Sequence, residues 1–254
     1  MKRPFTFFAL VTLALLSYAL YQGLVVAPTE STMGNVQRIF YYHLPHAWVA
    51  FLLFFVNFLA SIWYLIRRTE RSDALALASA EVGVVFCTVV LVTGPLWARP
   101  VWGIWWTWDA RLTSTLVLWL IYVSYLVLRR FATGAQTQVL AAALSIFGFL
   151  DVPIVYLSIR YFRTQHPQPV IAGGEGSGLD PRMWTAVLWN LAGFLSFALL
   201  LIWMRYRLAL AENAVEEAHA NRDLGPAAEM RASKPGGESA PEYDSVPKVG
   251  NKPR

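Results

Sequence analysis

Long uncharged stretches constrain the fold of this 254-residue chain more than any other feature. A helix needs about 20 apolar residues, at 1.5 Å each, to cross roughly 30 Å of hydrocarbon. Hydrophobic residues make up 56% of the chain, against a usual value of about 45–50%. We therefore expect an all-α, polytopic membrane protein with six transmembrane helices. The six apolar runs cover residues 5–27, 45–66, 74–96, 112–128, 136–159 and 184–204.

Basic residues predict which helix ends face the cytoplasm, because short cytoplasmic loops carry an excess of Lys and Arg. Lys2 and Arg3 precede the first run, RRTERSD follows the second, and Arg129 and Arg130 follow the fourth. The three remaining loops are longer and carry basic residues more sparsely. We expect both termini on the cytoplasmic side of a bacterial inner membrane, with the second outer loop facing out.

The composition changes near Arg207, which predicts two parts: a six-span domain at 1–207 and a cytoplasmic segment at 208–254. Residues 208–220 should extend the last helix. Residues 221–254 carry too few large apolar groups to repay the entropy of ordering, so we expect disorder there. The single cysteine, Cys87, excludes an internal disulfide and a cysteine-based zinc site. The sequence shows no P-loop, and its net charge of +5 does not point to nucleic acid.

The segment VWGIWWTWDARLTS, residues 101–114, has four tryptophans within seven residues, followed by an aspartate and an arginine. Tryptophans at a membrane surface explain one or two of them. A short helix over residues 101–110 would place several of these side chains on one face. That face would be a flat, mostly apolar, interfacial plate made of Trp102, Trp105, Trp106 and Asp109. Asp109 could equally cap the fourth helix.

Two histidines flank this segment in the outer loops. His43 lies just before Pro45, where the second helix should begin, and His166 also precedes a proline. Imidazole is a normal axial ligand of haem iron, and indoles pack well on a porphyrin face. The propionates of a haem would need cations, and the outer-face candidates are Arg38, Arg99, Arg111, Arg160 and Arg163. Taken alone, each histidine is more often an interfacial residue, and we expect neither His46 nor His219 to be a ligand.

Two carboxylates fall within predicted spans. Glu81 is in the third and Asp151 in the fifth. Charges at such depth are costly, so they are usually paired or functional. Pro153 should kink the fifth helix and free a carbonyl group.

At this point the tryptophan segment resembles the signature of haem-handling proteins of cytochrome c biogenesis. Among these, the chain most resembles the cytochrome c maturation protein C family, also called haem exporter protein C. The likeness covers roughly residues 30–205. The resemblance rests on the six-span layout, the HLP histidine, LVTGPLWARPVWGIWWTWDARLTS, DVPIVYLSI and the histidine of the last outer loop.

The resemblance implies a haem-transfer scaffold rather than an enzyme. Such a protein holds non-covalent haem b at the outer face and delivers it to a membrane-anchored haem chaperone. The implied partners are that chaperone, the ATPase and permease subunits of an ATP-binding cassette transporter, a small single-span subunit and membrane lipid. By position, His43 and His166 inherit the role of axial ligands. The other implied haem-binding residues are Trp102, Trp105, Trp106, Trp108, Asp109 and Arg111.

Three alternatives compete with this interpretation. A cytochrome c synthase subunit with the same signature would typically have more spans and a further histidine pair inside them. A membrane electron carrier would also need histidines within its helices. This chain has none there beyond His46 at a helix edge. A secondary transporter using Glu81 and Asp151 would leave the tryptophan segment unexplained.

Overall fold

The computed structural model describes residues 2–132, 134, 136–167 and 178–232. The chain divides into two units, Met1–Asn213 and Ala214–Arg254. The first is entirely helical, and its described part contains six segments long and apolar enough to cross a membrane. The second begins within helix α7, which runs to Ala232 and so passes the expected end at residue 220. The rest of the predicted disordered tail, 233–254, lies outside the described residues.

The expected number of spans is confirmed. Helix α1 passes directly into a π-helical turn, Gln22–Val26, and a 3-10 turn, Asn35–Ile39, leads directly into α2. The fifth span consists of two helices, α5 and α6. The helices are α1 Lys2–Tyr21, α2 Phe40–Arg67, α3 Glu70–Trp102, α4 Ala110–Phe131, α5 Thr137–Phe149, α6 Asp151–Tyr161 and α7 Pro181–Ala232.

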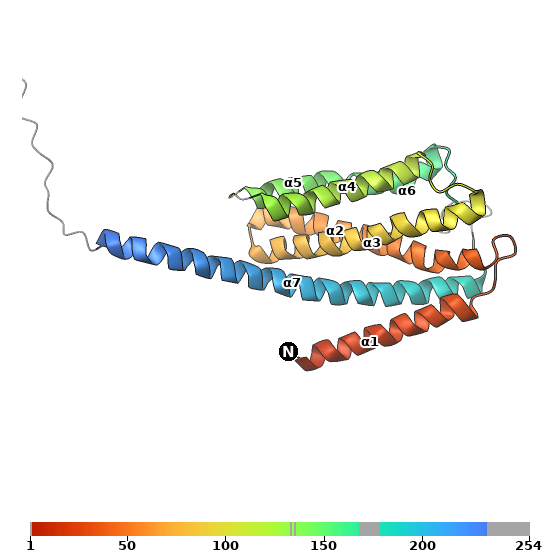
Figure 1. The fold of residues 1–254 in the computed structure, drawn as a ribbon, viewed down its shortest axis with the longest axis horizontal. Coiled ribbons are helices and arrows are strands. Elements are labelled where there is room, and N and C mark those ends of the chain that lie inside the picture. The colour runs from red at the N-terminus through yellow and green to blue at the C-terminus, as the bar shows by residue number, and fades with distance from the viewer. Residues whose placement is uncertain (1, 133, 135, 168–177, 233–254) are drawn as a thin grey trace, which may run out of the picture. The chain divides into compact units, whose positions relative to one another are not determined.

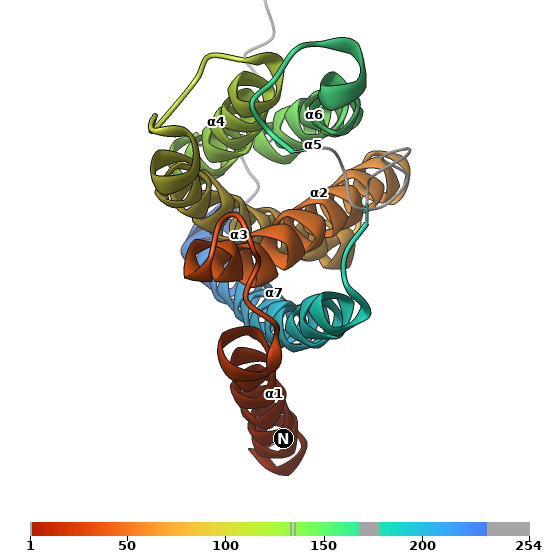
Figure 2. The same ribbon diagram turned by 90° about the vertical axis from the view of Figure 1, so that its right-hand side faces the viewer.

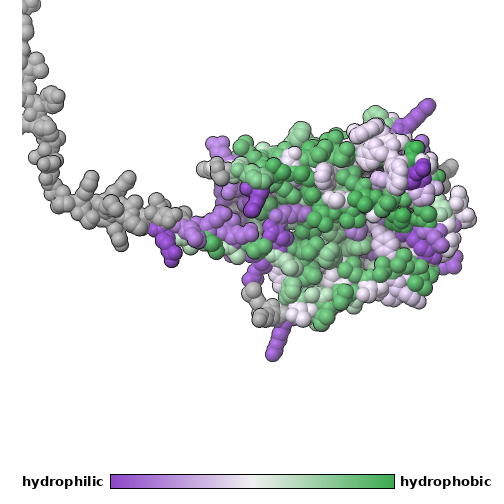
Figure 3. All heavy atoms as spheres, viewed as in Figure 1, coloured by the Kyte–Doolittle hydropathy of each residue, from purple (hydrophilic) through white to green (hydrophobic). Residues whose placement is uncertain are grey.

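The helices of the first unit lie in layers. Helices α2 and α3 form the middle, α4 with α5 and α6 covers one side, and α7 followed by α1 covers the other (Figures 1 and 2). Apolar side chains dominate the middle of the visible face, and hydrophilic ones gather toward its ends (Figure 3). This banding is what a bilayer requires of a spanning bundle.

Small residues allow the two middle helices to pack closely. Helix α3 buries Ala74, Ala76, Ala78 and Ala80. A β-carbon at Gly83 would stand 2.7 Å from the Phe54 ring of α2, so only glycine fits at this crossing. Close approach at small residues is the usual way in which helices associate in membranes, where apolar burial between them drives little.

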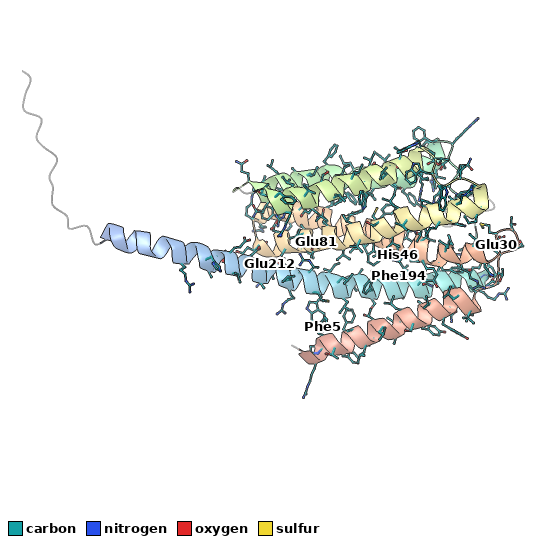
Figure 4. The ribbon with its side chains drawn as sticks, in the orientation of Figure 1. Phe5, Glu30, His46, Glu81, Phe194 and Glu212 are labelled. Carbon is teal, nitrogen blue, oxygen red and sulfur yellow. The ribbon has the colours of Figure 1, made fainter. Side chains whose placement is uncertain are left out.

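At one end of the bundle, polar side chains of different helices pair with one another. Asp73 of α3 forms a two-bond ion pair with Arg129 of α4, at 2.6 and 2.7 Å. Glu81 of α3 pairs with Arg205 of α7 in the same way, at 2.5 and 2.7 Å, and lies on the side of α3 that faces α7 (Figure 4). Buried Asn57 donates to the carbonyl of Ala76 at 2.7 Å. We call this part of the bundle, where the arginines of the 67–71 and 129–130 segments lie, the basic end.

Two helix boundaries differ from expectation, and the fifth span is interrupted near its predicted kink. Helix α2 starts at Phe40, five residues before Pro45, because the preceding 3-10 turn has already begun the spiral. His43 is thus inside the helix rather than on an extended entry. Helix α3 continues through two prolines as far as Trp102. The fifth span breaks at Leu150, close to the predicted kink, since Pro153 provides no N–H for the carbonyl four residues earlier.

Candidate functional site: a cavity with two histidines

The loops carrying tryptophans and the second histidine meet at the end of the bundle opposite the basic end, at the right of Figure 1. We call residues 103–109 the Trp loop and residues 162–167 the His loop. The expected short helix over 101–110 is wrong. Helix α3 ends at Gly103, whose φ of 78° lies in the left-handed region, and residues 104–109 form no helix. Glycine enters this region without the penalty that a β-carbon brings.

His43 is on α2, and a contact with α3 fixes which of its two ring nitrogens carries the proton. Its side chain is only 8% exposed, and its Nδ1 lies 2.8 Å from Oγ1 of Thr93. The Thr93 hydroxyl donates its single hydrogen to the carbonyl of Val89 at 2.7 Å. It can therefore only accept from the imidazole, so Nδ1 carries the proton and the lone pair is on Nε2.

His166 has the same tautomer as His43, but a different hydrogen bond fixes it. Its Nδ1 lies 2.9 Å from the carbonyl oxygen of Pro167, which can only accept, so Nε2 again holds the lone pair. Burial and, after it, the nearby Arg111 cation lower the pKa of His166 to about 4. The ring is neutral at physiological pH, with one nitrogen available to a metal.

The two imidazoles lie close together, with ring centres 6.4 Å apart and planes at 38°. Two metal–imidazole bonds of about 2 Å, plus about 1 Å from each ring centre to its nitrogen, would separate the centres by about 6 Å. The sequence pattern predicted histidines at matching depths. The structure adds that they are neighbours.

Both histidines line a cavity between the middle layer and α4 with α6. The cavity extends into the bundle along apolar groups of α2 and α3, including Ala50, Phe51 and Leu91. Aromatic groups surround the part of the cavity next to the Trp loop. Within the described chain the indole N–H groups of Trp97 and Trp106 are buried without a hydrogen-bond partner. The tryptophans lining it are Trp97, Trp102, Trp105 and Trp106.

Arg111 places a positive charge on the cavity wall. Its Nη1 donates to the carbonyl of Val155 at 3.2 Å, and no carboxylate of the described residues lies within ion-pair distance of it. A buried cation without a counter-ion is costly. An anionic group bound in the cavity would reduce this cost.

Asp109 lies behind the cavity wall rather than on it. It caps α4 by accepting from the N–H of Leu112 at 2.9 Å, which confirms its expected capping role. Its second oxygen accepts from Thr164 of the His loop at 2.8 Å. Burial acts to raise the pKa of Asp109, but these and further hydrogen bonds outweigh it and hold the pKa below its usual value.

Other residues singled out from the sequence lie elsewhere. Trp108 is 76% exposed and does not line the cavity. His46 lies between α2 and α7, where its ring packs against Phe194 (Figure 4). Two of the predicted propionate partners bind loop carbonyls: Arg38 donates to Gly23 and Arg99 to Gly103.

Sequence reasoning missed Thr93 and Thr164 as parts of this site, and Trp97 was not among the named haem-binding residues although it belongs to the same tryptophan-rich stretch. The second proline of α3 separates Trp97 from the other tryptophans in sequence. For this reason the sequence did not indicate that Trp97 lines the same cavity wall. A threonine within an apolar run carries no local signal of the histidine that it contacts, so neither Thr93 nor Thr164 stood out.

Comparison with known proteins supplies the context of this cavity. A family model described as Heme exporter protein C matches residues 1–221. A Heme exporter protein C from Bradyrhizobium diazoefficiens is 33% identical over 84% of this chain and 79% of its own length. The protein of that name from Haemophilus influenzae is 32% identical over 80% of this chain and 83% of its own. A ccmC-like mitochondrial protein of cytochrome c biosynthesis from Arabidopsis thaliana is 32% identical over 78% of this chain and 75% of its own.

The family model extends over all six spans, both histidines and the tryptophan segment, so it concerns the whole membrane unit rather than one motif. The chain therefore belongs to the Heme exporter protein C family of multi-pass membrane proteins of cytochrome c biogenesis.

Proposed function

We propose that this protein holds haem b in the cavity, with His43 and His166 as its two axial ligands, and delivers it to a haem chaperone. The observation that carries the proposal is the pair of imidazoles with ring centres 6.4 Å apart, each with Nδ1 hydrogen-bonded and with no hydrogen bond to Nε2 among the described residues. Metal-bound histidines usually donate their other ring N–H in this manner, which fixes the tautomer and the ring orientation.

The donor set favours a porphyrin over a free metal ion. Among the described residues, no group of three or more His, Cys, Asp or Glu side chains could hold a metal. A protein site for zinc needs three or four such ligands, whereas a porphyrin supplies its own ring nitrogens and needs only axial ones. The indole-rich wall suits its apolar faces, and Arg111 would pair with a propionate.

Each group of the site has a separate task in holding this cargo. The bound iron would supply two axial coordination positions, and the imidazoles would fill them. The apolar depth of the cavity excludes water from the macrocycle, and Arg111 favours the orientation that brings a carboxylate toward the Trp-loop end. Handover then requires that an acceptor provides a competing ligand at that end.

The distribution of basic residues supports an orientation with the basic end in the cytoplasm and the cavity on the outer side of a bacterial inner membrane. There the cavity would face a membrane-anchored chaperone. The transporter subunits and the small single-span subunit would work beside this protein, since the chain shows no nucleotide-binding motif of its own. Glu81 is paired with Arg205, which leaves it unsuited to a role as a coupling carboxylate.

The test is the absorption spectrum of purified protein reconstituted with haemin in detergent. The parent protein should give a low-spin bis-histidine spectrum. His43→Gly and His166→Gly should each convert it to high spin, and added imidazole should restore it by filling the vacated position. His46→Gly, whose ring packs away from the cavity, is the matched control and should keep the parent spectrum. A parent-like spectrum in both ligand variants would contradict the proposal.

A further inference from the structure

We infer that Asp109 is a positioning residue that holds the His loop against the Trp loop and thereby keeps His166 in place as a ligand. The inference rests on the proposed function, because it concerns one of the two proposed axial ligands. It gives the aspartate of the tryptophan signature a different task from that of a platform residue in contact with haem.

The hydrogen bonds of the Asp109 carboxylate divide between its two oxygens. Oδ1 accepts only from the N–H of Leu112 at 2.9 Å, which caps α4. Oδ2 accepts from the hydroxyl of Thr107 in the Trp loop at 3.0 Å. It also accepts from the hydroxyl of Thr164 at 2.8 Å and the N–H of Gln165 at 3.3 Å, both in the His loop. One oxygen thus joins two loops that are 55 residues apart in sequence.

Thr164 passes this contact on to the ligand. Its hydroxyl donates to Asp109 and accepts from the backbone N–H of His166 at 3.1 Å. A hydroxyl has one hydrogen and two lone pairs, so it can make both bonds at once. The backbone of His166 is thereby fixed to the start of α4 through two side chains.

The His loop has few other anchors. Phe162 caps the end of α6 through its N–H, and His166 bonds to its own neighbour Pro167. Among the hydrogen bonds of the described residues, those to Asp109 are the ones that tie residues 163–167 to a different element. The carboxylate keeps its charge at physiological pH, and charged acceptors form the stronger hydrogen bonds. Loss of this contact would therefore free the loop while the rest of the bundle remained in place.

The division between the oxygens allows the clamp to be removed without the helix cap. In Asp109→Asn the amide oxygen can still accept from Leu112, and Asn is as good an N-cap as Asp. The amide nitrogen cannot accept from the N–H of Gln165, and it can bond to the two threonine hydroxyls only as a donor, without the charge of the carboxylate. Thr164→Val removes the relay from the other side and leaves Asp109 unchanged. Both variants should fold and should place His166 poorly.

The experiment uses the full-length protein in detergent, loaded with haemin, and measures two properties. One is the low-spin fraction in the absorption spectrum. The other is the rate of haem transfer to excess apomyoglobin. In Asp109→Asn and Thr164→Val we expect the low-spin fraction to fall several-fold and the transfer rate to rise about tenfold, with imidazole restoring the low-spin state as in His166→Gly.

The matched control is Glu30→Gln. Glu30 is also a carboxylate that accepts from backbone N–H groups of a loop, those of Thr32 and Met33, at the same end of the bundle (Figure 4). Its amide variant should keep the parent spectrum and rate. Parent-like behaviour of Asp109→Asn and Thr164→Val beside a high-spin His166→Gly would overturn the clamp and leave the proposed function intact. A parent-like spectrum of His166→Gly would instead overturn the proposed function.

Discussion

The two ends of the bundle treat buried polar groups in opposite ways. At the basic end the carboxylates of Asp73 and Glu81 are paired, with Arg129 and Arg205 respectively. At the Trp-loop end Arg111 has no carboxylate partner among the described residues, and two indole N–H groups are unsatisfied. Buried polar groups in proteins are normally satisfied. The contrast supports the proposal that the Trp-loop end receives a ligand, whereas the pairs at the basic end need none.

The largest expected effect is at the basic end. Asp73→Asn leaves the Arg129 charge buried, since both side chains are only about a tenth exposed. We expect the free energy of unfolding to fall by about 3–5 kcal/mol, measured by denaturation in micelles. The matched variant Asp180→Asn breaks an exposed pair with Arg182 at the other end and should leave the free energy of unfolding almost unchanged. Equal losses in the two variants would contradict the contrast.

At the Trp-loop end we expect a substitution to change haem affinity rather than the free energy of unfolding. Arg111→Met removes a buried charge that lacks a partner, so the unfolding free energy should stay the same or rise. Haem affinity should fall about 10–100-fold, as expected for about 1.5–3 kcal/mol from a charged hydrogen bond. Titration with haemin measures the affinity. A loss of stability like that of Asp73→Asn, with unchanged haem binding, would show that the cation is structural.

A smaller effect should follow from Thr93→Val. The change keeps the shape but removes the acceptor that fixes the His43 tautomer, and such indirect partners of a metal ligand typically contribute about tenfold in affinity. Thr88→Val is the control. Like Thr93, Thr88 donates its hydroxyl hydrogen to the carbonyl four residues earlier, but its oxygen accepts from the indole N–H of Trp119 rather than from a histidine. Haemin titration of both variants should show weakening in Thr93→Val only.

The smallest effect should come from mild acid. The pKa of His166 is about 4, lowered first by burial and then by Arg111. The ring therefore stays neutral as pH falls from 7 to 5, and the low-spin spectrum should persist until pH 4 or below. Because the unfolded chain binds this proton near pH 6.5, the ligand-free protein should become less stable between pH 6.5 and 4. A spectral transition near pH 6.5 would contradict a buried ligand.

The sequence predicted the parts of the molecule that local patterns encode. Apolar runs determine the six spans, and the placement of the outer loops correctly put His43 and His166 at one end. Helix boundaries were harder, because Pro45 and Pro100 suggested interruptions that the helices absorb. The cost of a proline is one lost hydrogen bond and a local clash, which neighbouring packing outweighs in these helices.

The details of the site could not be predicted for a different reason. The contact between Asp109 and Thr164 joins distant segments, and its donors are common residues with no periodicity. The pairing of His43 with Thr93 crosses two helices in the same way. Only the tertiary arrangement brings such groups together, whereas the aromatic character of the segment was evident from its composition.

Gly103 has a consequence for how the aromatic segment can vary. Open space surrounds the position where its β-carbon would be, so a larger side chain would meet no obstacle. The penalty arises from the backbone angle, about 1–2 kcal/mol for an ordinary L-residue in this region, and it would favour extension of α3. A D-alanine would be accepted there and an L-alanine would not. The backbone angle at Gly103 ends α3 before Trp105 and Trp106. What restricts substitution there is therefore the chirality of the residue rather than the size of its side chain.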